Sequence, residues 1–310
     1  MRARVSVALR LAAALTATTL GSCAAPNTDE ESLAASPIPT WESYLASAQR
    51  TPDGGFVVEW DLWFPDEAAL LEYYQMLIDS SAEKAHVWTQ ISTGKRLVWP
   101  VSRAQDIRYC VSQASLGANY QIIVDEMKLA ASEWESVANI NFRYVATEDS
   151  NCTPANASID LAVQHHGTVG CAVPPLANWT GTPPTIMPCG VPKLLGINYT
   201  LANSAGQNPK SSLGVLRHEL GHAIGFRHEH AFQIGEEGYG CGEFAQLESA
   251  DQGGEALIES YDADSVMHYP SLECGWGHNH DYILTPKDGR SARALYGMPA
   301  SWYIATGLLL

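Results

Sequence analysis

One segment of the chain, residues 218–228, constrains its fold and function more than any other; it reads His-Glu-Leu-Gly-His-Ala-Ile-Gly-Phe-Arg-His. His218 and His222 are four residues apart, so on a helix both imidazoles project from one face and can bind the same metal ion. Gly225 permits a backbone conformation that ends the helix, and His228 then returns toward the same point. Three histidines with one open position are the ligands of a catalytic zinc site, so we predict one zinc ion here.

The side chain of Glu219 lies beside the two helical histidines, where we expect it to reach a water at the metal rather than the metal itself. A bare His-Glu-x-x-His sequence also occurs by chance on amphipathic helices that carry exposed histidines. The glycine and the third histidine at fixed offsets make that alternative much rarer, given ordinary residue frequencies. The motif therefore favours a hydrolytic metal site.

A second motif follows at residues 265–269, Ser-Val-Met-His-Tyr. His-Glu-x-x-His-x-x-Gly-x-x-His followed by a methionine-containing turn resembles the metzincin zinc endopeptidases. Within that clan, the form of this turn and the Gly-Phe-x-His-Glu-His sequence at residues 225–230 are similar to the astacin family. The resemblance is specific over residues 213–230 and 262–270 and diffuse elsewhere.

The resemblance implies a peptide-bond hydrolase and a role for each residue of the two motifs. Glu219 would be the general base, taking a proton from water activated by zinc and delivering it to the leaving amine. Tyr269 matches a residue that is a further zinc ligand, which moves away and donates a hydrogen bond to the developing oxyanion; a packed, non-catalytic tyrosine is the alternative. Met267 would form an apolar floor beneath the histidines.

The first 22 residues are predicted to be a signal peptide. Three arginines precede an apolar run at residues 11–20, which is too short to span a membrane as a mature helix. The sequence Leu-Gly-Ser-Cys at residues 20–23 resembles the lipobox of bacterial lipoproteins, in which the cysteine becomes lipidated. We therefore expect export and a lipid anchor at Cys23, on the bacterial outer membrane or cell surface; an ordinary secretory signal, giving a secreted protein, is the alternative.

The charge of the mature chain excludes some partners. Three of the 18 basic residues lie in the signal peptide, which leaves 15 basic against 34 acidic residues and a net charge of −19. A strongly acidic chain argues against nucleic acid and anionic lipid as partners. We expect a protein or peptide substrate; the sequence does not predict an oligomeric state.

Six cysteines remain after Cys23, and an even number in an exported chain predicts disulfides. The sequence Met-Pro-Cys-Gly-Val-Pro at residues 187–192 resembles the cysteine switch of matrixin propeptides, but its place inside the catalytic domain favours a disulfide for Cys189. Several pairings are open. Order along the chain and loop length favour Cys110–Cys152, Cys171–Cys189 and Cys241–Cys274.

The order of predicted elements defines the domains. After the signal peptide (residues 1–22), residues 23–50 have little periodicity and are predicted to be a tether. Residues 51–95 are predicted to be a pro-segment or N-terminal appendage, with a strand at 54–63 and a helix at 65–78. A catalytic domain is predicted at residues 96–300 and a tail at 301–310.

Within the catalytic domain, apolar residues four and three apart from Ile123 to Val137 predict a long helix with one buried face. Thr285-Pro286 opens a last helix that ends near Tyr296. Alternating patterns predict strands at 107–111, 140–144, 159–163 and 194–199, with an irregular disulfide-stapled loop at 167–193. We predict an α+β fold, metzincin-like by resemblance, with a twisted mixed sheet and long helices in the N-terminal subdomain and an irregular C-terminal subdomain with one terminal helix.

Two other functions are consistent with parts of the sequence. The first is a non-catalytic zinc-binding surface lipoprotein module, against which the intact Glu219 argues, because a structural site does not use a base. The second is a zinc hydrolase acting on a non-peptide bond, against which the methionine-containing turn argues.

Overall fold

The computed structural model describes residues 40–51, 54–58, 62–78, 89–90, 95–167, 170–172, 175, 189, 191–202, 211–229, 262–268, 279 and 281–299. All of them belong to one compact unit, Pro37–Leu310. None of the helices within these ranges combines the length and the apolar character that crossing a membrane requires. The predicted signal peptide, most of the predicted tether and the predicted tail lie outside the described residues.

The α-helices are α1 (Trp41–Ser47), α2 (Glu67–Ile78), α3 (Val101–Ala104), α4 (Gln113–Leu116), α5 (Tyr120–Val137), α6 (Tyr199–Ala202), α7 (Ser212–Ala223) and α9 (Pro286–Tyr296). Two short 3₁₀ helices are η1 (Gly117–Asn119) and η2 (Ala146–Asn151). The strands are β1 (Gln49–Arg50), β2 (Phe56–Val58), β3 (Leu62–Phe64), β4 (Thr89–Gln90), β5 (Lys95–Arg96), β6 (Ile107–Val111), β7 (Phe142–Tyr144), β8 (Leu161–His165), β9 (Cys171–Ala172) and β10 (Leu194–Ile197).

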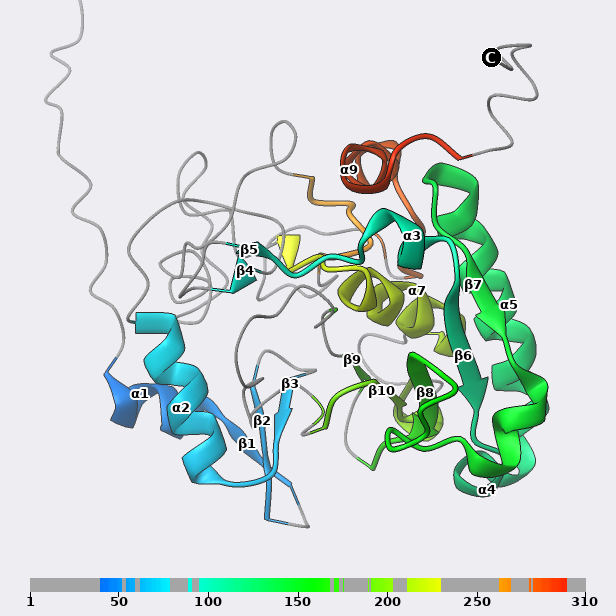
Figure 1. Ribbon diagram of the computed structural model, residues 1–310. Helices are drawn as coiled ribbons and strands as arrows, with labels where there is room; N and C mark the ends of the chain where they lie inside the picture. Colours follow the sequence, from blue (N-terminus) through cyan, green and yellow to red (C-terminus); the bar gives the residue numbers. More distant parts are fainter. Residues whose placement is uncertain are drawn as a thin grey trace, which may run out of the picture. The chain divides into compact units, whose positions relative to one another are not determined.

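A five-stranded mixed sheet, in the order β7-β6-β8-β10-β9, forms the centre of the catalytic part (Figure 1). β7, β6, β8 and β10 are parallel, and β9 pairs with β10 in the opposite direction. Ile107 lies opposite Phe142, and Tyr109 lies opposite Leu161. The sheet combined with separate long helices confirms the α+β prediction.

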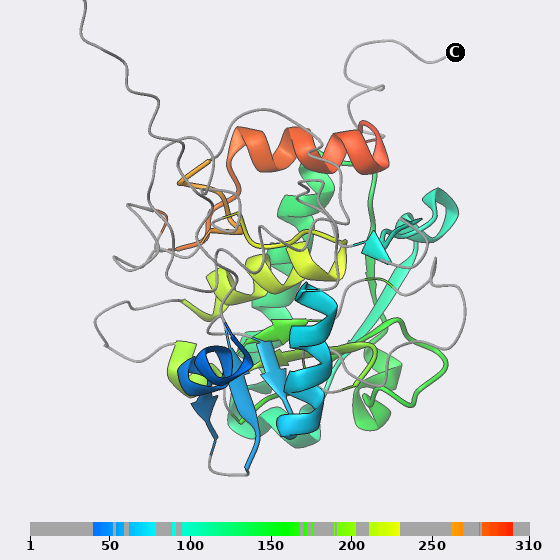
Figure 2. The same ribbon diagram turned by 90° about the vertical axis from the view of Figure 1, so that its left-hand side faces the viewer.

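Helix α5 has the buried face that its sequence predicts. Ile123, Met127, Ala130 and Trp134 are fully buried, and burying such side chains stabilises the fold by about 1.5–3 kcal/mol each for the larger ones. The helix contacts β6, β7 and α7, while α7 contacts β9 and β10. In both views α7 lies between strands β8–β10 and helix α9, so the segment with the zinc motif is surrounded by packed elements (Figures 1 and 2).

The predicted strands of the catalytic domain are present, although β7, β8 and β10 begin or end up to two residues away from the predicted positions. Strand β9 was not predicted, because a two-residue strand shows no alternation, and it lies inside the loop predicted to be irregular. Most of the predicted irregular C-terminal subdomain lies outside the described residues; its terminal helix, α9, is present and begins at Pro286 as predicted.

The prediction of one strand at residues 54–63 is wrong, because the structure has two antiparallel strands, β2 and β3. Phe56 lies opposite Phe64 and both rings are buried. The antiparallel pairing brings these two rings next to each other, whereas in one extended strand they would lie about 26 Å apart. They join Tyr44, Leu70 and Tyr74 in a hydrophobic cluster distinct from that of the catalytic part.

Helix α1 and strand β1 lie within residues 23–50, all of which we expected to be a tether, so the folded part begins earlier than predicted. Thr40 caps α1 by accepting a hydrogen bond from Ser43 N, and Tyr44 is fully buried against α2. The packing of one aromatic face, rather than a long periodic pattern, stabilises this short helix.

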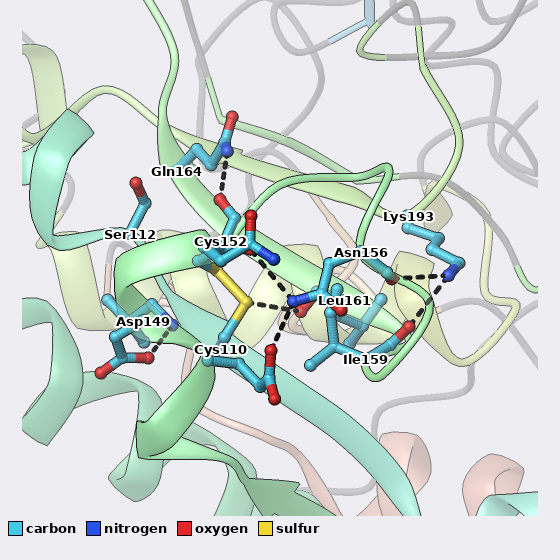
Figure 3. The surroundings of a disulfide bond; sticks show 12 residues. Cys110, Ser112, Asp149, Cys152, Asn156, Ile159, Leu161, Gln164 and Lys193 are labelled. Carbon is cyan, nitrogen blue, oxygen red and sulfur yellow. Dashed lines mark hydrogen bonds between the residues drawn. A yellow bond between two sulfur atoms is a disulfide. The ribbon is translucent and has the colours of Figure 1, made fainter.

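Two of the three predicted disulfides are present, Cys110–Cys152 and Cys171–Cys189; the predicted Cys241–Cys274 pair lies outside the described residues. Figure 3 shows the first bond, between β6 and the residue that follows η2. It closes a loop with a sequence separation of 42, which corresponds to about 4 kcal/mol of loop-closure entropy. Beside it, Lys193 Nζ donates to the carbonyls of Asn156 and Ile159, at 3.1 and 3.0 Å.

Candidate metal centre

Helix α7, which carries the first two histidines of the motif, has a defined start. Ser211 is its N-cap, and the Ser211 hydroxyl accepts a hydrogen bond from Gly214 N at 3.0 Å. The neighbouring Ser212 donates its hydroxyl hydrogen to Glu126 of helix α5.

The orientation of α7 is set by residues on the helix next to it. Arg217 forms an ion pair with Glu133 and also donates to the carbonyl of Asp281, at 3.0 Å. Trp134 Nε1 donates to the carbonyl of Arg217 at 2.9 Å. These bonds hold α7 against α5 at the residue that precedes His218.

Gly225 ends the helix in the way that the motif predicts. Its φ is +105°, a conformation that side-chain-bearing residues rarely adopt, and a Cβ built there would lie 2.6 Å from the carbonyl oxygen of Leu97. Gly225 N donates to the carbonyl of His222 at 2.9 Å, which closes the last turn. The chain therefore reverses here and brings His228 back to the helix.

The structure brings His218, His222 and His228 together. One nitrogen of each lies within 4.8 Å of the corresponding nitrogen of the other two, and all three rings are buried. Within the ranges that the structure describes, they form the one group of three or more histidines, cysteines and acidic residues with this spacing. The site is therefore a single centre built from α7 and the turn that follows it.

Hydrogen bonds fix which nitrogen of two histidines faces this centre. His218 Nδ1 donates to the carbonyl of Val266 at 2.7 Å, and His222 Nδ1 donates to the carbonyl of Phe226 at 2.8 Å, because a carbonyl oxygen can only accept. The lone pairs are then on Nε2. His222 Nε2 and His228 Nε2 are 3.1 Å apart, close to the ~3.3 Å between two nitrogen ligands of a tetrahedral zinc ion. The donor set fits zinc.

Glu219 is almost completely buried next to the histidines. The backbone just before strand β9 passes beside its carboxylate: a Cβ built on Gly170 would lie 2.6 Å from Glu219 Oε1 and 2.5 Å from Val215 Cγ1. The absence of a side chain at position 170 thus leaves space for the carboxylate between α7 and the edge of the sheet.

Met267 lies against helix α7 at Gly221, the glycine between His218 and His222. A Cβ built on Gly221 would lie 2.3 Å from Met267 Sδ and 3.3 Å from a ring carbon of Trp134. The thioether thus occupies a gap that only glycine leaves open. Glu229 N donates to the carbonyl of Met267 at 2.9 Å, which joins the end of the zinc motif to the methionine-containing turn.

Tyr269, predicted to be a metal ligand and an oxyanion donor, lies outside the described residues. Asp288, to which the sequence patterns assigned no part in the site, bonds through its carboxylate to Ser265 and Val266 of the turn. The signal that could have found it is the Thr-x-x-Asp capping box at residues 285–288, in which the acidic side chain bonds back to the N-cap backbone.

The pKa of Asp288 is perturbed by its surroundings. Burial raises the pKa of this carboxyl to about 6, although hydrogen bonds from Ser265, Val266 and Thr285 act in the opposite direction. The negative charge of Glu229 adds to the increase. Burial thus outweighs three hydrogen bonds that favour the charged form.

Three converging histidines, a glycine-ended helix, a buried glutamate and a methionine-containing turn define a metzincin-type metal centre. Within that class, residues 203–295 match the family model described as Astacin (Peptidase family M12A). This match confirms the similarity to astacin-like metzincins that the two motifs predicted.

The curated relatives are much longer proteins. The chain is 34% identical over 129 residues to Tolloid-like protein 1 of Homo sapiens, a match that covers 36% of this chain and 12% of that protein. It is 35% identical over 123 residues to bone morphogenetic protein 1 of Xenopus laevis, covering 36% of this chain and 17% of that protein. The chain thus spans less than a fifth of the length of these relatives.

Two solved structures are similar to parts of the chain. Myroilysin has a TM-score of 0.41 and 17% identity, with 64% of this chain and 95% of that chain covered. High choriolytic enzyme 1, a hatching-enzyme zinc protease from Oryzias latipes, has a TM-score of 0.39 and 15% identity, with 68% of this chain and 99% of that chain covered.

Proposed function

We propose that the protein is a zinc-dependent metalloendopeptidase that hydrolyses peptide bonds of protein or peptide substrates. The observation that carries the proposal is the convergence of His218, His222 and His228 beside the buried Glu219, in a segment that matches the astacin family. A structural zinc site has four permanent protein ligands, whereas the described residues bring together three histidines, and the further ligand assigned below to Tyr269 is one that moves away.

The three histidines would hold the ion through Nε2. A zinc ion held there acts as a Lewis acid that acidifies water and polarises a peptide carbonyl. Glu219 accepts a proton from the attacking water as the new carbon–oxygen bond forms, and then delivers this proton to the nitrogen of the leaving amine as the carbon–nitrogen bond breaks. Burial beside Gly170 restricts the carboxylate to the neighbourhood of the histidines.

Tyr269 is assigned a supporting role on the basis of its place in the motif. It would be a further ligand of the ion in the resting enzyme and would donate its phenolic hydrogen to the developing oxyanion. The position of Met267 against Gly221 supports its interpretation as packing beneath the site, with no chemical step of its own.

The test compares purified wild-type protein with Glu219→Gln, which keeps the size of the side chain and removes the base. We expect wild-type protein to cleave casein, and Glu219→Gln to retain one equivalent of zinc while losing at least about 100-fold of the activity. Glu67→Gln, at an exposed position in α2, is the matched control and should have full activity.

The same experiment separates the alternatives. Zinc-loaded wild-type protein with no more activity than Glu219→Gln would favour the non-catalytic zinc-binding module. Cleavage of ester or small amide substrates without cleavage of casein would favour a hydrolase of non-peptide bonds.

We also propose that the protein is exported and attached to the outer membrane or cell surface through a lipid on Cys23. The lipobox-like sequence at residues 20–23 supports this. Cys23→Ala should move the protein from the membrane fraction to the soluble fraction, and mass spectrometry of the wild-type N-terminus should show acyl chains. A protein cleaved elsewhere and released would support the secreted alternative.

A further inference from the structure

The carboxylate of Asp288 bonds to two separate parts of the molecule. Its Oδ2 accepts a hydrogen bond from Thr285 N at 2.8 Å, and Asp288 N donates to Thr285 Oγ1 at 3.2 Å, which together form the capping box of α9. The same Oδ2 accepts from Val266 N at 2.9 Å, while Oδ1 accepts from the Ser265 hydroxyl at 2.6 Å. The cap of the last helix is therefore also an anchor of the methionine-containing turn.

From Ser265 the hydrogen bonds continue to a histidine of the metal centre. The Ser265 hydroxyl oxygen accepts from Met267 N at 3.0 Å. The carbonyl of the same amide group, that of Val266, accepts the hydrogen of His218 Nδ1 at 2.7 Å. The N–H of this peptide group is thus linked to the Asp288 carboxylate through the Ser265 hydroxyl, and its carbonyl accepts a hydrogen bond from His218, a predicted zinc ligand.

The direction of each donor is fixed along this chain of bonds. The imidazole N–H donates to a carbonyl, the amide N–H to a hydroxyl oxygen, and the hydroxyl to a carboxylate oxygen. Bonds aligned in this way polarise one another, so negative charge on Asp288 makes the Val266 carbonyl a stronger acceptor. A stronger acceptor on Nδ1 makes Nε2 of the same ring a better metal ligand.

The arrangement at His222 is different. Its Nδ1 donates to the carbonyl of Phe226, four residues along the same segment. Phe226 N in turn donates to the carbonyl of Gly221, at 3.0 Å. This histidine is therefore oriented by the local turn, whereas His218 is oriented by a turn nearly fifty positions later, which depends on Asp288.

From these contacts we propose that Asp288 and Ser265 are positioning residues for His218, acting through the amide group between Val266 and Met267. The inference rests on the proposed function, because it assigns His218 to a zinc site. It goes beyond that function because it assigns the orientation and basicity of one zinc ligand, His218, to a residue of the last helix. Neither residue belongs to the group of three histidines, and each acts through the turn.

The test measures zinc affinity by competition with a chromophoric chelator, which does not depend on peptidase activity. Ser265→Ala removes the hydroxyl from the chain of bonds, and we expect it to weaken zinc binding by about 10- to 100-fold. Ser265→Thr keeps the hydroxyl and should bind zinc within about threefold of wild-type protein. Asp288→Asn should be at least as weak as Ser265→Ala.

Thr285→Ala is the matched control for a purely structural role. It removes the threonine half of the capping box and the bond from Thr285 Oγ1 to Asp262, but leaves the bonds from Asp288 to the turn. We expect a lower melting temperature with zinc affinity within about threefold of wild-type protein. If Asp288→Asn does not fold, the comparison of Ser265→Ala, Ser265→Thr and Thr285→Ala is sufficient.

Zinc affinity of Ser265→Ala equal to that of wild-type protein would overturn the inference, as would an equal loss of affinity in Thr285→Ala. Failure of the proposed function has a different signature. In that case wild-type protein binds zinc and cleaves no peptide, while the ranking of the variants by zinc affinity still supports or overturns the role of Asp288.

Discussion

The indole nitrogen of Trp99 donates a hydrogen bond to the carbonyl oxygen of Ala223, at 2.9 Å. Ala223 is the last residue of helix α7, and the last carbonyls of a helix have no partner within it. The next carbonyl, of Ile224, accepts from the hydroxyl of Tyr296, which itself accepts from Trp99 N at 3.3 Å. Residues far apart in the sequence therefore cap the helix just before the glycine that turns the chain toward His228.

Replacing Trp99 by phenylalanine should destabilise this helix end. A smaller aromatic ring remains but the donor is lost, so the carbonyl of Ala223 loses its partner, which costs about 1–3 kcal/mol. We expect the free energy of unfolding in urea to fall by that amount and zinc affinity to fall with it. Trp41→Phe, in the separate N-terminal cluster, is the control and should leave zinc affinity unchanged. Unaltered stability in Trp99→Phe would contradict the capping role.

Gly225→Ala should prevent assembly of the centre. The new methyl group would lie 2.6 Å from the carbonyl oxygen of Leu97, and the backbone would be strained at a φ of +105°. Gly297→Ala is the control, because Gly297 has a φ of +84° but no heavy atom within 4 Å of its Cβ position. Both variants should lose about 1–3 kcal/mol of stability to backbone strain.

Only Gly225→Ala, however, should also lose zinc, measured as metal content after dialysis. Equal zinc content in the two variants would contradict the prediction, because it would show that the clash with Leu97 does not change the position of His228.

How far the sequence predicts this site depends on the distance between interacting residues. The three histidines, Gly225 and Glu219 lie within eleven consecutive positions, and helix periodicity alone brings the first two to one face. The α5 stripe and the cap of α9 are equally local, so both helices were predicted correctly.

What the sequence could not show are contacts between segments that only the folded chain brings together. Gly170 is adjacent to Glu219, Trp99 caps α7, and Asp288 reaches the methionine-containing turn. None of these residues is separated from its partner by a sequence spacing that a helix, strand or known motif repeats. The separate N-terminal strands were missed for another reason, since the sequence from Phe56 to Phe64 also fits one extended strand.

The pKa of Asp288 predicts a specific dependence of stability on pH. Burial raises this pKa from 3.8 to about 6 in the folded protein, so between these values the folded state holds the proton more tightly than the unfolded state. The stabilising contribution of the carboxyl is complete below about pH 4 and is lost as the pH rises through 6, a difference of about 3 kcal/mol.

Urea unfolding of wild-type protein and Asp288→Asn between pH 4 and pH 7 measures this. Wild-type protein should lose about 3 kcal/mol relative to the variant as the pH rises. Titration of the Asp288 carboxyl carbon by NMR gives the pKa directly in wild-type protein, and a midpoint near 4 would contradict the prediction.

Gly170→Ala should impair Glu219 while leaving the histidines intact. The added methyl group would meet Glu219 Oε1 at 2.6 Å and Val215 Cγ1 at 2.5 Å, so either the carboxylate or the strand must move. A displacement of about 1 Å in a catalytic group can cost about 100-fold in rate. We therefore expect kcat to fall by roughly this factor with zinc content unchanged, because no ligand histidine contacts the new methyl group among the nearest atoms.

Gly167→Ala, three residues earlier and with no heavy atom within 4 Å of the new Cβ, is the control and should keep its activity. The double variant Gly170→Ala/Val215→Ala removes the contact with Val215 but keeps the one with Glu219. If crowding of the carboxylate causes the defect, the double variant should remain slow; recovery of full activity would instead assign the defect to the displaced strand.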